Sequence, residues 1–491
     1  MGVIARQSLK ASAVNYAGAF IGILNTFFLF TLCFDESELG QVRYIQEIAI
    51  LFANFASLGI FNVVIRFFPD FKTQDNKNQG ILSFAILVLL LGLFLLGVIL
   101  FLYSSLLPKN ITDNALLIFV IASAVVFGSL FYNYSSNFGL VTIPSLLKNL
   151  YVKIGLAFFG LAYFYSLIDF SQVLNSVAIV YATSAVLLIL YLSRKGNFKL
   201  SSDFSFFTKQ RLRKIGTFAG FGMLGTLGSG LANKIDIFMV ADLLNYTRTG
   251  VYTIALNASN LLMIPTAGIM AVSGPVIVSA LKKNDIYEVE QIYKKAGINL
   301  FLFGSLILLL LWSNIDSIFE LIPNGEKYSS GKIVVLILGG AKLFDMLTSV
   351  NELIISYSKY FRFNLYALLI LAVINITANV ILIPEFDITG AALATLLSVV
   401  LYNVGKAIFI YIKFGIHPFQ AKLLIIMGMS LMLYGANLLL PPFSNPFLSI
   451  LFKSLFLGLS FIFFAIYFNI SDEATKLWRQ VKSKLQAIFD K

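Results

Sequence analysis

The sequence predicts an all-α polytopic membrane protein with about 14 transmembrane helices. Its mean hydropathy is +0.87 and only 12% of its 491 residues are charged, which excludes a large water-soluble domain. Apolar stretches of about 20 residues, each long enough to cross a hydrocarbon core of about 30 Å, recur along the whole chain. Basic residues fall between alternate pairs of these stretches, which is the pattern of a multi-pass topology.

Each apolar stretch predicts one transmembrane span, and the loops between the spans are short. The loop after the sixth span is the longest and the most basic, with Arg194, Lys195 and Arg211 among its residues. The positive-inside rule therefore places both termini and this loop in the cytoplasm. The spans are expected near 8–33, 43–68, 80–103, 114–136, 143–167, 170–193, 214–241, 249–273, 295–319, 333–357, 363–383, 388–412, 420–440 and 446–469.

The long basic loop also divides the chain into two similar halves. A shift of about 210 residues places Leu39-Gly40 over Thr249-Gly250, with a long span beside each pair. Six spans per repeat give both halves the same orientation in the membrane, and they predict two six-helix lobes related by pseudo-twofold symmetry, plus two extra C-terminal helices. The expected parts are an N-lobe at 1–193, a cytoplasmic linker at 194–213, a C-lobe at 214–413, spans 13 and 14 at 414–469, and a tail at 470–491.

The tail at 470–491 has the pattern of an amphipathic cytoplasmic helix. Ser471 can cap its start, and Leu477, Trp478 and Leu485 lie on one apolar face, opposite several basic residues. This pattern favours a helix that lies on the inner leaflet as an anchor.

Several function classes are disfavoured by what the chain lacks. A single cysteine, Cys33, rules out a disulfide framework, and no Cys/His spacing suggests a metal site. No Gly-rich phosphate loop is present, and the single histidine, His417, has no nearby catalytic partner, so no cofactor and no enzymatic activity are predicted. The net charge of +12 is better explained by topology and anionic lipid headgroups than by nucleic acid, because no soluble domain offers a binding face.

Charged residues within spans are costly and usually face a polar cavity. On the tenth span Lys342, Asp345, Ser349 and Glu352 share one helical face, with Asp345 near mid-depth. These residues are candidates for substrate binding or ion coupling. The alternative is a structural salt bridge between Lys342 and Asp345, which are three residues apart.

Four further charged residues are candidates on other spans. Lys234 and Asp236 lie near the end of the glycine-rich seventh span, on nearly opposite faces. They either face a polar cavity or extend to water at the outer membrane interface. Arg66 lies near the inner end of the second span, so an ordinary position at the inner membrane interface is the alternative to a functional role. Lys153 lies about two turns into the fifth span, and its depth favours a functional role.

Amides form a polar face on the first span, where Asn15 and Asn25 align with Gly18 and Gly22. Amide groups can bind sugar hydroxyls. They also hold helices together within the membrane, and the pattern favours this structural role slightly over the binding role.

The chain resembles the polysaccharide-transporter branch of the multidrug/oligosaccharidyl-lipid/polysaccharide exporter superfamily, the branch that contains the O-antigen and capsule flippases. The resemblance covers nearly the whole length. It rests on the fourteen spans, on Ser8-Leu9-Lys10 through Asn15, on Lys234-Ile235-Asp236 followed by Gly250-Val251-Tyr252, and on Gly390-Ala391-Ala392-Leu393-Ala394-Thr395.

The resemblance implies a flippase of the bacterial inner membrane that moves an undecaprenyl-pyrophosphate-linked oligosaccharide to the outer leaflet by alternating access, for surface polysaccharide biosynthesis. It also implies cavity cations for the pyrophosphate and a coupling ion, H⁺ or Na⁺. Related lipid II flippases carry arginines on their first span, where this chain has Asn15 and Asn25. The alternatives are an ion-coupled multidrug exporter and a membrane enzyme such as a polymerase, which the short outer loops disfavour.

Overall fold

The structure is a computed structural model that describes residues 3–71, 80–201, 204, 207–440 and 444–471. For residues 3–13, 229 and 231–233 only the backbone is described. Within these ranges the chain is helical and contains no β-strand. The predicted tail at 470–491 lies almost wholly outside the described residues.

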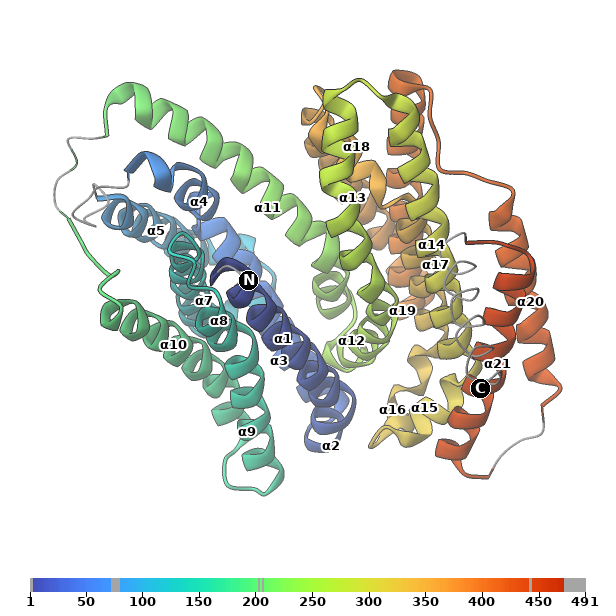
Figure 1. Ribbon diagram of the computed structural model, residues 1–491. Coiled ribbons are helices and arrows are strands. Elements are labelled where there is room, and N and C mark those ends of the chain that lie inside the picture. The colour runs from blue at the N-terminus through green and yellow to red at the C-terminus, as the bar shows by residue number, and fades with distance from the viewer. Residues whose placement is uncertain (1–2, 72–79, 202–203, 205–206, 441–443, 472–491) are drawn as a thin grey trace, which may run out of the picture. The chain divides into compact units, whose positions relative to one another are not determined.

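The helices follow one another with short connections (Figure 1). They are α1 (Val3–Leu24), α2 (Phe30–Cys33), α3 (Glu36–Ala56), α4 (Ile60–Phe71), α5 (Ile81–Gly97), α6 (Lys109–Thr112), α7 (Ala115–Ser136), α8 (Thr142–Ser145), α9 (Val152–Phe164), α10 (Phe170–Arg194), α11 (Lys209–Leu243), α12 (Tyr246–Asn260), α13 (Ile264–Lys282), α14 (Ile286–Ser313), α15 (Ile315–Leu321), α16 (Gly325–Tyr328), α17 (Lys332–Thr348), α18 (Val350–Tyr357), α19 (Arg362–Phe414), α20 (Lys422–Leu438) and α21 (Pro446–Tyr467).

Every predicted span coincides with a helical segment of the described chain. Nine segments are long and apolar enough to cross a membrane, or eleven if each of two bent helix pairs is one span. The long α19 joins two predicted spans across Asp387, whose φ of 55° breaks the helix. The other two spans are α11 and the 17-residue α20.

Large apolar side chains cover much of the helical surface, as lipid contact requires. Leu102 is 76% exposed and Phe158 is 65% exposed. In water such a surface would aggregate, whereas in a bilayer it contacts acyl chains. The chain is therefore a multi-pass membrane protein.

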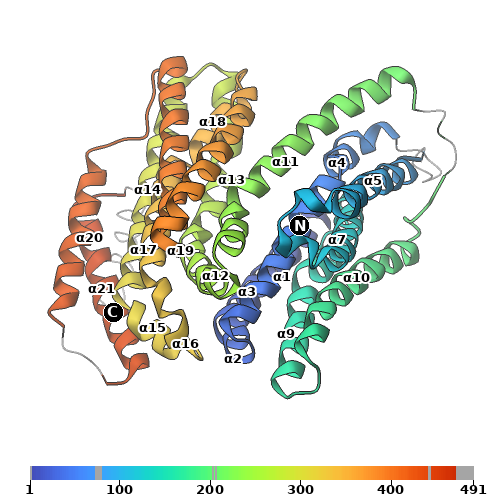
Figure 2. The same cartoon turned by 180° about the vertical axis from the view of Figure 1, so that it is seen from behind.

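Contacts divide the chain into a first unit, residues 1–253, and a second unit, residues 254–491. In the first unit α7 packs against α3, α4, α5 and α10, while α11 packs against α3 and α4, as both views show (Figures 1 and 2). In the second unit α17 packs against α14 and α19, and α20 and α21 pack on α14. The lobes that the repeat predicts, at 1–193 and 214–413, stay a prediction.

The second span is bent where α3 gives way to α4. The two helices meet at 43°, and Leu58 and Gly59 between them have φ values of 47° and 75°. Gly59 also lies against α11, since a Cβ there would be 2.1 Å from the carbonyl oxygen of Ala219. Glycine is required at Gly59 both by its left-handed conformation and by this close approach.

The first turns of α3 and α12 meet through two glycines. A Cβ on Gly40 would be 1.8 Å from the carbonyl oxygen of Tyr246, and one on Gly250 would be 2.1 Å from that of Glu36. A shift of about 210 residues relates Gly40 to Gly250 and Glu36 to Tyr246, so the contact is reciprocal under the predicted repeat. Such a reciprocal contact, in which equivalent residues of two copies touch each other's partners, is typical of a two-fold relation.

Candidate functional site

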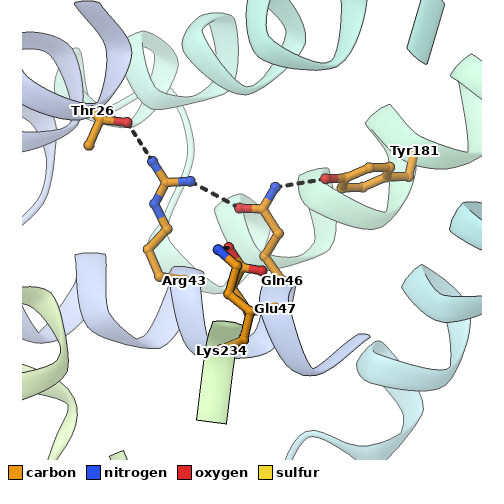
Figure 3. Close-up of polar contacts among 6 residues, drawn as sticks. All are labelled: Thr26, Arg43, Gln46, Glu47, Tyr181 and Lys234. Atoms are coloured by element: carbon orange, nitrogen blue, oxygen red, sulfur yellow. Dashed lines mark hydrogen bonds and ion pairs between the residues drawn. The ribbon is translucent and has the colours of Figure 1, made fainter. Parts of the chain in front are cut away.

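Polar side chains from three segments meet inside the first unit around Arg43 of α3. The Arg43 guanidinium donates to Thr26 Oγ1 at 2.9 Å and to Gln46 Oε1 at 3.3 Å. Gln46 donates in turn to the hydroxyl of Tyr181 on α10 at 2.8 Å, as Figure 3 shows. We call Thr26, Arg43, Gln46 and Tyr181 the Arg43 cluster. Its Arg43 Nε is buried and has no hydrogen-bond partner among the described residues, so it remains available as a donor.

Three predicted site residues meet where α1 packs on the fifth span. Lys153 Nζ donates to the Gly18 carbonyl oxygen at 2.7 Å, and Asn25 Nδ2 donates to the Lys153 carbonyl oxygen at 2.8 Å. Asn15 Oδ1 accepts from Asn149 Nδ2 at 2.9 Å. In this structure both amides bond across to the fifth span, and their role in binding a substrate stays a prediction.

Both helices of this contact carry a π-helical turn. One turn runs Asn25–Leu29 and directly follows α1, and the other runs Leu146–Tyr151 and directly precedes α9. Such turns widen a helix locally and are frequent at functional sites. Here one turn contains Asn25 and Thr26, and the other ends two residues before Lys153.

The charges around the Arg43 cluster leave an excess of cations. Lys153 and Arg43 interact as like charges. Neither forms an ion pair within the described part of the chain. The nearby carboxylate of Glu47 is bound by Lys234, with 2.8 Å between Nζ and Oε1 (Figure 3). An anion placed between Arg43 and Lys153 would relieve their repulsion.

The seventh-span pair, Lys234 and Asp236, has two separate environments. Lys234 pairs with Glu47 on α3, whereas Asp236 is 3% exposed and accepts a hydrogen bond from the Tyr252 hydroxyl at 3.1 Å. The near-opposite faces predicted for the two residues agree with this arrangement. The sixth predicted residue of this unit, Arg66, is exposed on α4 and belongs to a different pocket.

The four polar residues predicted to share one face of the tenth span, Lys342, Asp345, Ser349 and Glu352, lie in the second unit and do not form one straight face. α17 and α18 are bent by 42° at Ser349, whose hydroxyl donates to the Met346 carbonyl oxygen, so Glu352 lies beyond the bend. Asp345 accepts from Asn403 Nδ2 of α19 at 2.9 Å. The alternative salt bridge is not formed, because Lys342 has no ion pair among the described residues.

A buried lysine lies close to this stripe. Lys406 of α19 is 2% exposed, and its ammonium donates to the Tyr402 hydroxyl at 3.0 Å. It interacts electrostatically with the carboxylates of Asp345 and Glu352. Lys406 is therefore a buried cation that the carboxylates of the tenth span attract without forming an ion pair with it.

Sequence reasoning missed Arg43, Gln46, Glu47 and Lys406. Arg43 and Glu47 lie in the first turns of the second span, where a charge looks interfacial, although their spacing of four residues was a usable signal. Lys406 lies near the inner end of the twelfth span, where snorkelling was expected. No group of His, Cys, Asp and Glu suited to a metal ion occurs in the part of the chain that the structure describes.

Comparison with known proteins extends these observations. No protein-family model matches the chain. A probable low-salt glycan biosynthesis flippase, Agl15 of Haloferax volcanii, is 22% identical over 250 residues, which are 50% of this chain and 52% of that protein. The chain thus spans about half the length of this curated relative.

Solved transporter structures match over most of the chain. The lipid II flippase MurJ, in an inward closed conformation, has a TM-score of 0.71 at 14% identity and covers 94% of this chain and 98% of its own. An inward-facing multidrug resistance MATE family transporter has a TM-score of 0.61 at 13% identity, covering 81% and 94%. A transporter from Pyrococcus furiosus has a TM-score of 0.55 at 14% identity, covering 84% and 95%. The chain therefore has the fold of the MOP superfamily transporters, the superfamily that its sequence resembles.

Proposed function

We propose that the chain is a flippase that moves a lipid-linked oligosaccharide, carried on undecaprenyl pyrophosphate, from the inner to the outer leaflet by alternating access. The observation that carries the proposal is the pair of cations Arg43 and Lys153, neither of which forms an ion pair within the described residues, although hydrogen bonds hold both inside the first unit. A pyrophosphate supplies the missing negative charge. The work is translocation and needs no covalent chemistry.

The neighbouring groups suit the rest of such a headgroup. Amide and hydroxyl groups such as Gln46 and Tyr181 can exchange their mutual hydrogen bonds for bonds to sugar hydroxyls. Two of the compared proteins carry names that point the same way, since one is a probable glycan biosynthesis flippase and the other a lipid II flippase.

An apolar groove in the second unit suits the lipid part of the substrate. It has a volume of about 710 Å³, and its lining is almost entirely apolar. Its walls come from α14, α17 and the start of α20, with Phe301, Phe344 and Met427 among the lining residues. A polyprenyl chain can lie in such a groove.

The location that we propose is a bacterial inner membrane, where membrane lipids are constant partners. The loop charges support an orientation with both termini in the cytoplasm. Surface polysaccharide biosynthesis is the process that we assign to the transporter. In that setting the substrate is made on the inner leaflet and used on the outer one.

A drug exporter is the second candidate, because MATE family transporters share the fold. A cationic drug needs an acidic cavity, and the Arg43 cluster with Lys153 is cationic instead. This charge favours the flippase.

Deletion of the gene separates the two candidates. We expect lipid-linked oligosaccharide to accumulate on the inner leaflet and a surface glycan to disappear, both restored by the parent gene. The measurement is extraction of lipid-linked sugars together with glycan staining of intact cells. Unchanged glycans with raised sensitivity to cationic dyes would reject the flippase and support the exporter.

Asp345 is our candidate for coupling to H⁺ or Na⁺. Its carboxylate accepts a hydrogen bond from Asn403 and forms no ion pair within the described chain, so it is the group of this helix that we propose as the ligand of the coupling ion. We expect Asp345→Asn to reduce the stimulation of flipping by an imposed gradient about 5–150-fold, the usual size of such coupling. Flipping in proteoliposomes with and without the gradient measures this, and Glu320→Gln, at an exposed position on α15 of the same unit, is the control. An Asp345→Asn protein that responds to the gradient like the parent rules out the assignment.

A further inference from the structure

A second charged pocket lies in the first unit between α4 and α11, apart from the Arg43 cluster. Its volume is about 710 Å³. Arg66 and Asp70 of α4 line one side, and Arg213 and Lys214 of α11 line the other, with Phe67 and Phe218 between them. The proposed transport cycle makes no use of this pocket.

The pocket exists because the two helices are held together on one side of it. At Gly222 of α11 a Cβ would lie 2.7 Å from Asn62 Nδ2, and Gly59 lies against Ala219. Beyond this contact the rings of Phe67 and Phe218 meet edge to face, with 5.6 Å between their centroids. The charged residues follow within about one turn, so the cations stand next to an aromatic wall.

The charges of the pocket are suited to an anion. Three cationic side chains face one carboxylate. None of Arg66, Arg213 and Lys214 forms an ion pair within the described residues, and all three are exposed. Guanidinium and ammonium groups in this state bind phosphate oxygens readily.

The surroundings indicate an anion that is attached to a lipid. The loop charges place this end of α4 and of α11 at the inner face of the membrane, at headgroup depth. Phe67, Phe218 and Phe221 offer an apolar surface beside the cations, which a soluble phosphate would leave unused. A lipid fills both parts, with its phosphate on the cations and its chain on the rings.

We propose that this pocket binds the phosphate group of a membrane lipid. Two sources share this chemistry: an anionic phospholipid of the inner leaflet, and the polyprenyl pyrophosphate of the substrate before it reaches Arg43. Only the second source rests on the proposed function.

Native mass spectrometry of the purified, full-length protein tests the proposal with defined lipids. The probes are phosphatidylglycerol, undecaprenyl pyrophosphate, and phosphatidylcholine, whose phosphate is neutralised by its own choline. The test variant combines Arg66→Gln, Arg213→Gln and Lys214→Gln. The control combines Arg194→Gln, Lys195→Gln and Lys199→Gln, which removes equal charge from exposed positions around the end of α10.

We expect the test variant to bind at least one of the two anionic lipids at least about ten-fold more weakly than the control does, since each basic residue near the membrane surface adds to the attraction. Loss for phosphatidylglycerol identifies a bulk phospholipid, and loss for undecaprenyl pyrophosphate alone identifies the substrate. Phosphatidylcholine binding should not change. Equal binding of both anionic lipids by test and control variants overturns the proposal.

Asp70→Asn gives an independent arm if the triple variant does not fold. Removing this carboxylate should tighten binding of the same anionic lipid several-fold, because its repulsion of the phosphate is lost. Unchanged or weaker binding by Asp70→Asn contradicts the site. Flipping assays on Arg43 variants test the proposed function separately. The lipid site can therefore be rejected without rejecting the flippase function, and the reverse also holds.

Discussion

Arg43→Gln is expected to abolish transport of the lipid-linked oligosaccharide while the protein still folds. The glutamine can keep a hydrogen bond to Thr26, so α3 remains joined to the π-helical turn that follows α1. What is lost is one of the two cations proposed to hold the pyrophosphate. Removing one partner of a desolvated charge pair costs about 2–5 kcal/mol, which weakens binding at least about 30-fold.

The measurement is flipping and binding of undecaprenyl pyrophosphate by reconstituted protein. Lys153→Gln should give a similar loss, and Arg43→Lys should keep part of the activity, since it retains the charge but loses the planar fork. Lys283→Gln, at an exposed position after α13, is the matched control. Parent-like transport by both Arg43→Gln and Lys153→Gln would remove the basis of the proposed function.

Gly40→Ala is expected to break the contact between α3 and α12. The added Cβ would lie 1.8 Å from the Tyr246 carbonyl oxygen, a backbone atom that no rotamer change can move. The helices must separate, at a cost of at least about 1–3 kcal/mol by the usual scale of overpacking. Gly250→Ala should act alike, because its Cβ would meet the Glu36 carbonyl oxygen at 2.1 Å.

Thermal unfolding in detergent measures the lost stability, and cross-linking of a Glu36→Cys, Tyr246→Cys pair in a Cys33→Ala background reports the contact itself. We expect less cross-linking and a lower Tm in Gly40→Ala. Gly428→Ala in α20 is the control, since its Cβ would meet nothing within 4 Å. If Gly40→Ala matched Gly428→Ala in both measurements, the close approach would not limit the fold.

The membrane explains why the spans could be predicted so fully from sequence. Every backbone group must be satisfied within its own helix, so length and hydropathy determine where a helix runs. The bends could not be read in the same way. The turn at Leu58 and Gly59 depends on the position of Ala219, and the bend at Ser349 leaves no apolar or charge signal in the sequence.

The candidate sites were predictable where a side chain sits well inside a span. Lys153 was singled out by its depth and Asn25 by the polar face that it shares on the first span, and the structure brings the two together. Arg43 and Lys406 were missed because depth in sequence does not measure burial. Lys406 lies near a span end and is nevertheless covered by neighbouring helices.

The reciprocal contact of Gly40 and Gly250 has a consequence for how the two halves of the predicted repeat can diverge. Each glycine meets a carbonyl oxygen that lies four residues before the other glycine, and every residue has such an oxygen. Glu36 and Tyr246 could therefore become an acid and an aromatic without disturbing the contact. Only glycine is required at both positions. The residues around the pair can therefore be substituted without loss of the contact, whereas the two glycines cannot.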